Sequence, residues 1–324
     1  MKAIAQHRYG SADVLGVEEV DRPEIADDEV LVRVHAASVN PADWHFMRAS
    51  PFFMRLMSGL TKPKQAVRGV DVAGRVEAVG EGVSRFAPGD EVFGCCEGAF
   101  AEYASAKEED LVPKPASVTH EQAASVPLAG CTALQGLRNQ GRIASGQRVL
   151  IIGASGGVGT FAVQIAKSLG AEVTGVCSTR NVEMVRSLGA DHVIDYTRED
   201  VTRGKPYDLV FQLAGTASPS SLRRLLTPKG TLVLSSGEGR LSGIDRILAM
   251  VVSLPFVSQR QVTWVSETTQ EDLTLLAEWL EAGTITPVID RTFELEGAPA
   301  AIRYVEQGHT QGKVVVNVPT GHDV

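Results

Sequence analysis

The pattern of apolar and polar positions changes character about a third of the way along the chain. Residues 30–39, VLVRVHAASV, alternate at period two, and residues 69–83, GVDVAGRVEAVGEGV, are rich in Val and Gly. Residues 86–94, FAPGDEVFG, place a Pro-Gly turn before another short apolar run. Alternation interrupted by frequent turns is typical of short, curved strands. We therefore expect a small barrel-like β-domain in this part of the chain.

Beyond about residue 119, strand-like and helix-like segments follow one another. Helical spacing extends over 119–140, with Thr119 and Glu121 near its start. Alternating strands and helices indicate βαβ units and a doubly wound parallel sheet, so the fold class is α/β. Strands are expected at 147–153, 172–177, 208–215, 230–236 and 262–265, and helices at 160–170, 181–190 and 272–283.

Strand-like sequence returns at the carboxyl end, in VIDRTFEL and KVVVNVP. We therefore expect one domain over 1–118 that is completed by 288–324, and a second domain over 119–287. Residues 51–67 interrupt the first domain with an apolar and basic insertion whose secondary structure the pattern does not predict.

Composition narrows the class of protein. The chain has 324 residues, of which 44% are hydrophobic and 22% charged, and its formal net charge is -8. These values indicate two folded domains and argue against a nucleic-acid partner. The four cysteines, at 95, 96, 131 and 177, lack the paired spacing of a disulfide framework or a structural zinc site.

The chain is expected to be cytoplasmic, to act on a small molecule and not to bind a membrane. Its amino end shows no apolar signal-peptide core. Its longest apolar run, 247–257, is far shorter than the ~20 residues that a membrane-spanning helix needs. This run is interpreted as a buried segment or a subunit contact, which makes a homodimer plausible.

A glycine-rich turn lies between the strand at 147–153 and the helix after it. Residues 151–159 read IIGASGGVG, and three small residues fit the spacing of the dinucleotide fingerprint, with Ala in its first position. Small residues let the backbone approach a pyrophosphate, which the helix amino terminus attracts. The alternative is a tight turn that binds nothing. The residues expected to bind the cofactor here are Ala154, Ser155, Gly156, Gly157, Val158 and Gly159.

The end of the next strand bears on which dinucleotide is bound. An NAD site usually has Asp or Glu there to hold the ribose 2′-OH. This chain has Cys177 followed by Ser178, Thr179 and Arg180, with no carboxylate. Arg180 can offer a cationic fork to a 2′-phosphate, and the two hydroxyl groups add neutral donors. We therefore expect NADPH, unless Arg180 only caps a surface turn.

Five motifs together resemble the medium-chain dehydrogenase/reductase superfamily over nearly the whole chain. The most similar branch is the zinc-independent quinone oxidoreductase-like group. The resemblance implies a GroES-like β-barrel-type domain and a Rossmann domain with a doubly wound parallel sheet, with NADPH in the cleft between them. The motifs are SVNPADW (38–44), GVDVAGRVEAVGEGV (69–83), PGDEVFG (88–94), IIGASGGVG (151–159) and GADHVIDY (189–196).

The resemblance also implies roles for individual residues. Asn40, the candidate catalytic residue, and Thr132 would lie near the nicotinamide, while Tyr196 would join Ser178 and Arg180 at the 2′-phosphate. Each of these residues has a purely structural alternative: Asn40 as a turn residue, Thr132 as a helix residue and Tyr196 as a core residue. Cofactor contacts at the ends of later strands would come from Leu213, Ala214, Gly215, Ser235 and Ser236.

The residues around Asn40 bear on whether a metal takes part. Zinc alcohol dehydrogenases of this superfamily have a Cys near this segment and a Gly-His-Glu motif farther along. Here the segment has no Cys, and Val70 and Asp71 stand where His and Glu are expected. A catalytic zinc needs about three converging protein ligands, and Cys131 with His45 would supply two. No metal is therefore expected.

Without a Lewis acid, reduction of an electrophilic acceptor is easier than oxidation of an alcohol. The predicted reaction is hydride transfer from NADPH to a quinone or an α,β-unsaturated carbonyl, with the protein holding the reactants together. Oxyanion charge would be met by Asn40, a backbone N–H or solvent. Asp43 and His45 are candidate proton donors, although neither is assigned.

The insertion supplies candidate substrate contacts. Phe52, Phe53 and Met54 would form an apolar wall, and Arg48 and Arg55 an anion-binding rim, unless the insertion only packs against the core. Enoyl-thioester reductases of the superfamily carry a Tyr donor shortly after the Asn-Pro motif, and this stretch has none. Two other functions stay open: an alcohol or aldehyde dehydrogenase with unrecognised metal ligands, and an NADPH-binding redox sensor without turnover.

Overall fold

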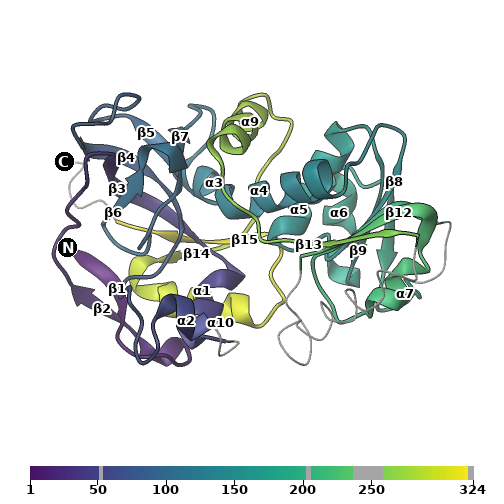
Figure 1. Cartoon of the computed structure of the whole chain (residues 1–324), viewed down its shortest axis with the longest axis horizontal. Coiled ribbons are helices and arrows are strands. Elements are labelled where there is room, and N and C mark those ends of the chain that lie inside the picture. Colours follow the sequence, from purple (N-terminus) through teal and green to yellow (C-terminus); the bar gives the residue numbers. More distant parts are fainter. Residues whose placement is uncertain (51–53, 202–205, 236–257, 320–324) are drawn as a thin grey trace. The chain divides into compact units, whose positions relative to one another are not determined.

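The computed structural model describes residues 1–50, 54–201, 206–235 and 258–319, and divides the chain into two compact units (Figure 1). The first unit comprises Met1–Cys131 and Glu267–Val324, and the second comprises Thr132–Ser266. The boundaries expected at 118 and 287 therefore differ from those of the units. The physical reason is packing: helix α3 (His120–Ala124) lies against strands of the first unit, and so does helix α9 (Gln270–Glu281).

A seven-stranded sheet forms the centre of the first unit, with the strand order β14-β15-β3-β4-β5-β7 and with β6 also paired to β3. Only β14 and β15 run parallel. The strands of this unit are β1 (Lys2–Gln6), β2 (Leu15–Glu19), β3 (Glu29–Val39), β4 (Asp71–Val79), β5 (Glu91–Cys95), β6 (Tyr103–Lys107), β7 (Leu111–Pro113), β14 (Ile289–Glu294) and β15 (Lys313–Asn317). Its other helices are α1 (Pro41–Arg48), α2 (Met54–Ser58) and α10 (Ala298–Glu306), and helix α4 (Pro127–Gln135) spans the boundary between the units.

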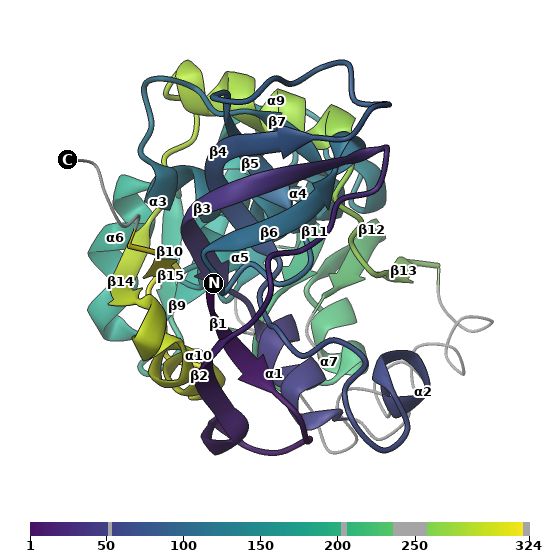
Figure 2. The same ribbon diagram turned by 90° about the vertical axis from the view of Figure 1, so that its left-hand side faces the viewer.

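The carboxyl-terminal strands complete this first sheet. β15 pairs antiparallel with β3 over Val314–Asn317 and Ala36–Val39, and Figure 2 shows β14 and β15 in yellow at this edge. The long strand β3 curves because its register with β4 shifts twice, between Leu31 and Val32 and between Val34 and Ala36. Curvature of this kind lets β3 pair with β15, β4 and β6. Residues from both ends of the chain, such as Ile4 and Val314, share the core of this unit.

The sheet of the second unit is parallel throughout, with the order β10-β9-β8-β11-β12-β13. This is the strand order of a Rossmann fold, and its topological switch point lies between β8 and β11. Its core includes Leu150, Val176, Val210 and Leu232. The strands are β8 (Arg148–Ile152), β9 (Glu172–Cys177), β10 (His192–Asp195), β11 (Tyr207–Gln212), β12 (Leu226–Leu234) and β13 (Arg260–Thr263), and the helices are α5 (Gly157–Ser168), α6 (Val182–Ser187) and α7 (Pro219–Arg223).

The helix expected over 119–140 is interrupted. α3 begins with a capping box, in which the Thr119 hydroxyl accepts the N–H of Gln122 at 3.2 Å and the Gln122 side chain accepts the N–H of Thr119 at 2.9 Å. The chain then restarts as α4 at Pro127 and ends in a π-helical turn, Gly136–Gln140. Proline has no N–H to continue the preceding helix, so the single helical pattern divides there.

Two segments that contain predicted substrate, cofactor or subunit contacts lie outside the described residues. These are 51–53, with Phe52 and Phe53, and 236–257, with Ser236 and the apolar run that suggested a dimer. The described part of the insertion contains α2, which begins at Met54. None of the helices in the described ranges is long and apolar enough to cross a membrane.

Candidate active site

The glycine-rich turn joins β8 to α5 in the second unit. The N–H groups of Gly153 and Ala154 both donate to the carbonyl of Val176 on β9, at 3.2 and 3.0 Å, which fixes the turn against the sheet. Gly153 has φ +88°, a conformation that glycine adopts at little cost. Gly156 caps α5, so the N–H groups of the first helical turn have no acceptor within the helix.

Gly159 shows how closely this helix approaches the turn. A Cβ at this position would lie 2.1 Å from the carbonyl oxygen of Gly153, whereas a Cβ at Gly156 would meet nothing closer than 3.5 Å. Residues 156–158 are half-buried. These residues lie at a helix amino terminus, which is where a pyrophosphate binds in a Rossmann fold. Ala154 to Gly159 fit a dinucleotide.

The ends of β9 and β10 bring together the residues predicted for the 2′-phosphate. Asp195 pairs with Cys177 across these strands, so Ser178 and Tyr196 follow at adjacent strand ends. Tyr196 is 57% exposed, which excludes the alternative that it is a core residue. Thr179 and Arg180 are exposed and begin a 3₁₀ turn, while Ser178 is half-buried.

Asp195 is a carboxylate near this position that sequence reasoning missed. It accepts hydrogen bonds from the hydroxyl groups of Thr179, at 2.5 Å, and Thr197, at 2.7 Å. These bonds, led by that from Thr179, lower the pKa of Asp195. The Arg198 guanidinium lies 3.6 Å away. The side chain of Asp195 is 8% exposed, so this charge is compensated locally, and Thr179 is engaged with it.

Two buried polar side chains form hydrogen bonds at the glycine-rich turn and at the ends of the strands beside it. The amide of Asn181 donates to the hydroxyl of Ser155 at 2.8 Å and so links the glycine-rich turn to the end of β9. The amide of Gln212, at the end of β11, donates to the carbonyl groups of Ala214 and Gly215 at 3.2 and 3.0 Å. Sequence reasoning missed both residues. A polar residue at the end of an otherwise buried strand is the signal that could have indicated Gln212.

The remaining predicted cofactor residues lie at the ends of the later strands or in α4. The N–H of Ser235 donates to the carbonyl of Gln212, which ties the end of β12 to the end of β11. Leu213 and Ala214 are half-buried, and Gly215 is exposed with φ +83°. Thr132 is 8% exposed in α4.

Asn40 lies in the first unit, where it caps α1. Its backbone N–H donates to Asp43 Oδ2 at 2.7 Å. Its side-chain amide donates to Asp71 Oδ2 at 2.8 Å and accepts from Lys313 Nζ at 2.5 Å. Asn40 is 2% exposed. The structure therefore surrounds the candidate catalytic residue with charged groups from α1, β4 and β15.

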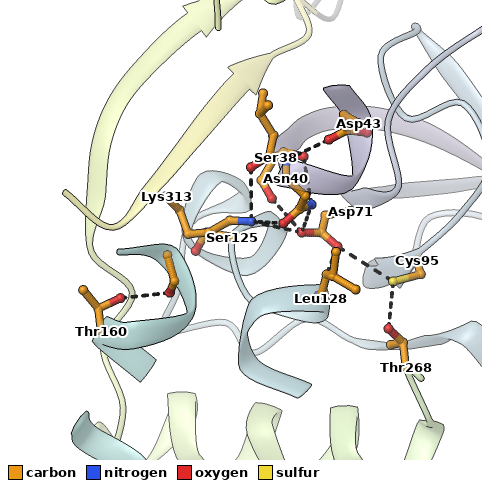
Figure 3. A network of polar contacts seen from close by, with 12 residues as sticks. Ser38, Asn40, Asp43, Asp71, Cys95, Ser125, Leu128, Thr160, Thr268 and Lys313 are labelled. Atoms are coloured by element: carbon orange, nitrogen blue, oxygen red, sulfur yellow. Dashed lines mark hydrogen bonds and ion pairs between the residues drawn. The ribbon is translucent and has the colours of Figure 1, made fainter. Parts of the chain in front are cut away.

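Asp71 and Lys313 form the centre of this cluster, which Figure 3 shows. The Nζ of Lys313 lies 3.4 Å from Asp71 Oδ2, and both side chains are almost inaccessible, at 3% and 0% exposure. Asp71 also accepts from the Ser38 hydroxyl at 2.7 Å and from the Leu128 N–H, in the first turn of α4, at 3.1 Å. The sequence signal that could have indicated this pair is a charged residue at the start of an otherwise apolar strand. β4 begins with Asp71 and β15 begins with Lys313.

The two candidate proton donors differ in their surroundings. Burial raises the pKa of Asp43 to about 7. Burial lowers the pKa of His45, whose Nδ1 lies 2.9 Å from the carbonyl oxygen of Ser50 and whose ring stacks on Trp44. Asp43 accepts a hydrogen bond from the backbone of Asn40, whereas the ring of His45 contacts the backbone just beyond the end of α1.

The arginines expected at a substrate rim also have partners. Arg48 pairs with Glu306 on α10, at 2.5 Å, and Arg55 lies over the ring of Tyr9, at 5.0 Å. Of the two residues that could act as metal ligands, Cys131 is fully buried in α4 and His45 lies in α1. Within the described ranges no group of three or more His, Cys, Asp or Glu side chains could hold a metal ion.

These observations define a class of protein: a two-unit α/β protein with a Rossmann sheet and the glycine-rich turn typical of dinucleotide-binding domains. Residues 26–116 match the family model of the alcohol dehydrogenase GroES-like domain, and residues 188–316 match that of the zinc-binding dehydrogenases.

The chain is 35% identical to the mitochondrial NAD(P)H oxidoreductase RTN4IP1 of Bos taurus, over 98% of this chain and 89% of that protein. It is 33% identical to the chloroplastic NADPH-dependent alkenal/one oxidoreductase of Arabidopsis thaliana, over 98% and 79%. The structure of Escherichia coli quinone oxidoreductase complexed with NADPH superposes with a TM-score of 0.85 at 26% identity, over 98% and 100%.

The chain belongs to the medium-chain dehydrogenase/reductase superfamily, in its quinone oxidoreductase-like branch, and is an oxidoreductase that uses a nicotinamide cofactor and a small-molecule substrate. The expected fold class is confirmed. The expectation of a cytoplasmic protein is contradicted by these two curated relatives, of which one is mitochondrial and the other chloroplastic. A folded domain carries no pattern that reports its compartment, since import is directed by separate targeting segments.

Proposed function

We propose that this protein reduces quinones or α,β-unsaturated carbonyl compounds with NADPH and without a catalytic metal. The observation that carries the metal-free part of the proposal is the buried ammonium group of Lys313 beside Asp71 and Asn40. A divalent cation at these two side chains would have to displace that ammonium group. The names of the relatives, a quinone oxidoreductase and an alkenal/one oxidoreductase, support the same class of acceptor.

The residues of each unit have separate tasks in this proposal. A bound nicotinamide supplies a hydride, and the chain itself binds and orients. Residues 154–159 border the pyrophosphate, which the backbone N–H groups at the start of α5 hold. Residues 213–215 and Ser235 border the strand ends along which a dinucleotide lies in a Rossmann sheet. In the first unit, the amide of Asn40 is held by two charged partners.

The preference for NADPH over NADH is proposed to come from the end of β9. Arg180, Ser178 and Tyr196 supply a guanidinium and two hydroxyl groups at adjacent strand ends. The only nearby carboxylate that we identify in the described part, Asp195, is covered by hydroxyl donors and is unsuited to hold a ribose 2′-OH. The net charge of -8 supports a small-molecule partner rather than a nucleic acid.

The reaction is tested by steady-state oxidation of NADPH with a panel of quinones, enones and aldehydes, each with and without a chelator. We expect turnover with quinones or enones that the chelator leaves unchanged. A requirement for stoichiometric metal would instead support an alcohol or aldehyde dehydrogenase. Tight NADPH binding without turnover on any acceptor would support a redox sensor.

The cofactor preference is tested by Arg180→Ala. We expect the NADPH-to-NADH ratio of kcat/KM to fall by about 10-fold or more, because a charge-assisted hydrogen bond contributes roughly 1.5–3 kcal/mol. Arg186→Ala is the matched control, since Arg186 is an exposed arginine on α6 that pairs with Glu183 at 2.7 Å. An unchanged ratio in Arg180→Ala would show that the 2′-phosphate is bound elsewhere.

A further inference from the structure

Lys313 is a buried lysine whose three donor positions are all directed at acceptors. Its Nζ lies 2.5 Å from Asn40 Oδ1, 3.4 Å from Asp71 Oδ2 and 3.4 Å from the carbonyl oxygen of Val39. Its side chain is 3% exposed. An ammonium group has three N–H donors, so this geometry accounts for each of them.

The Asp71 carboxylate is equally well occupied. Oδ2 accepts from the Ser38 hydroxyl, the Asn40 amide and Lys313, at 2.7, 2.8 and 3.4 Å. Oδ1 accepts from the Leu128 N–H at 3.1 Å. Buried charges persist in proteins when they are paired and hydrogen-bonded in this way. The Lys313 ammonium group and the Asp71 carboxylate are therefore both held in fixed positions.

The group between the two charges is the side-chain amide of Asn40. Its oxygen faces the ammonium group and its nitrogen faces the carboxylate, which is the favourable arrangement for both ends (Figure 3). A rotation of the amide by 180° would direct NH₂ at the ammonium group and oxygen at the carboxylate. Both contacts would then be repulsive, so the pair selects one orientation of the amide.

We propose that Lys313 is a positioning residue that, together with Asp71, holds the Asn40 amide in a single orientation for the reduction. The inference rests on the proposed function, because it takes Asn40 to act during hydride transfer. Replacing a buried ion pair by apolar residues is often neutral or stabilising, so stability alone does not explain the pair. Orienting a polar group is a task that two apolar side chains cannot perform.

Three variants separate positioning from simple stability. Lys313→Met removes the ammonium group, and Asp71→Asn/Lys313→Met removes both charges. Lys114→Met is the matched control, because Lys114 is also a buried lysine of the first unit, with 5% side-chain exposure and an ion pair to Glu91 at 3.1 Å. Each is compared with the wild type by urea unfolding of the cofactor-free protein, by NADPH affinity from fluorescence titration, and by kcat and KM for a quinone.

We expect Lys313→Met to lower the urea midpoint and to reduce kcat by about 100-fold, as misplacement of a catalytic group does. The NADPH Kd should change far less, because most of the cofactor contacts assigned above belong to the second unit. The double variant should recover the urea midpoint but not kcat. Lys114→Met should lower the urea midpoint and leave kcat intact.

Two results would overturn the inference while leaving the proposed function standing. One is wild-type kcat in Lys313→Met, and the other is recovery of kcat together with stability in the double variant. A wild type that does not oxidise NADPH with any acceptor would instead overturn the proposed function, and the positioning role would fall with it.

Discussion

Asp43 is expected to make the stability of the protein depend on pH. Asp43 is 3% exposed, and its Oδ2 accepts the Asn40 N–H at 2.7 Å. Burial raises its pKa from 3.8 to about 7, and the negative charge of Asp71 adds to the rise. The hydrogen bond from the Asn40 N–H lowers this pKa, as do the charges of Lys313 and Arg68 to a smaller extent. Burial dominates because the charged carboxylate loses the water that would solvate it.

The size and the sign of the effect follow from this rise in pKa. A difference of about 3 pKa units corresponds to about 4 kcal/mol of folding free energy, at 1.36 kcal/mol for each unit. The folded protein binds this proton more tightly than the unfolded chain does. The stabilisation is therefore complete below about pH 4 and is lost as the pH rises through about 7.

Asp43→Asn isolates this contribution. Asparagine keeps an oxygen that can accept the Asn40 N–H but does not titrate. We expect urea unfolding to show the wild type losing about 3 kcal/mol relative to the variant between about pH 5 and about pH 8. Asp21→Asn is the control, because Asp21 is an exposed aspartate of the same unit. Parallel pH dependences for the wild type and Asp43→Asn would refute the reasoning.

Three further predictions concern the turn, a helix cap and the thiols. Gly159→Ala places a Cβ 2.1 Å from the Gly153 carbonyl oxygen, so α5 must shift and NADPH affinity should fall at least tenfold by fluorescence titration; wild-type affinity would contradict this. Thr119→Ala removes the cap of α3 and should cost about 1 kcal/mol in urea unfolding, whereas no loss would show that the cap contributes nothing. Burial raises the pKa of Cys95, Cys96 and Cys177, that of Cys177 to about 11, so these thiols should react slowly with a disulfide reagent at about pH 8 until urea is added. Rapid labelling of the folded protein would contradict that expectation.

Most strands could be predicted from the sequence because their patterns are local. β9 begins and ends at the expected residues, 172 and 177, and Gly170 ends the preceding helical segment with φ +80°. The segment over 119–140 was predicted less well. Its helical spacing is real, but Pro127 divides it, and its first part, α3, packs against the strands of the first unit.

The strand, turn and helix around the glycine-rich turn could also be predicted, because their pattern is local. A strand, a run of small residues and a helix follow one another in the sequence, so local geometry alone creates the helix amino terminus at which we propose that the pyrophosphate binds. The juxtaposition of Ser178 with Tyr196 needed one further fact, the parallel register of β9 and β10. Asn181 and Gln212 needed the folded structure, because their roles depend on hydrogen bonds to Ser155 and to the 214–215 turn.

The sequence by itself indicated an α/β fold and a nucleotide-binding turn, because periodicity and glycine spacing act over a few neighbouring residues. The resemblance of its five motifs to a known superfamily implied an oxidoreductase. The sequence did not determine that Lys313 meets Asp71 and Asn40. These residues lie 242 and 273 positions away along the chain and come together only when β15 pairs with β3. A buried charge is stable only beside its partner, and that partner is selected by the register of the sheet. The fold was therefore readable from local pattern, whereas the electrostatics around Asn40 were decided by tertiary structure.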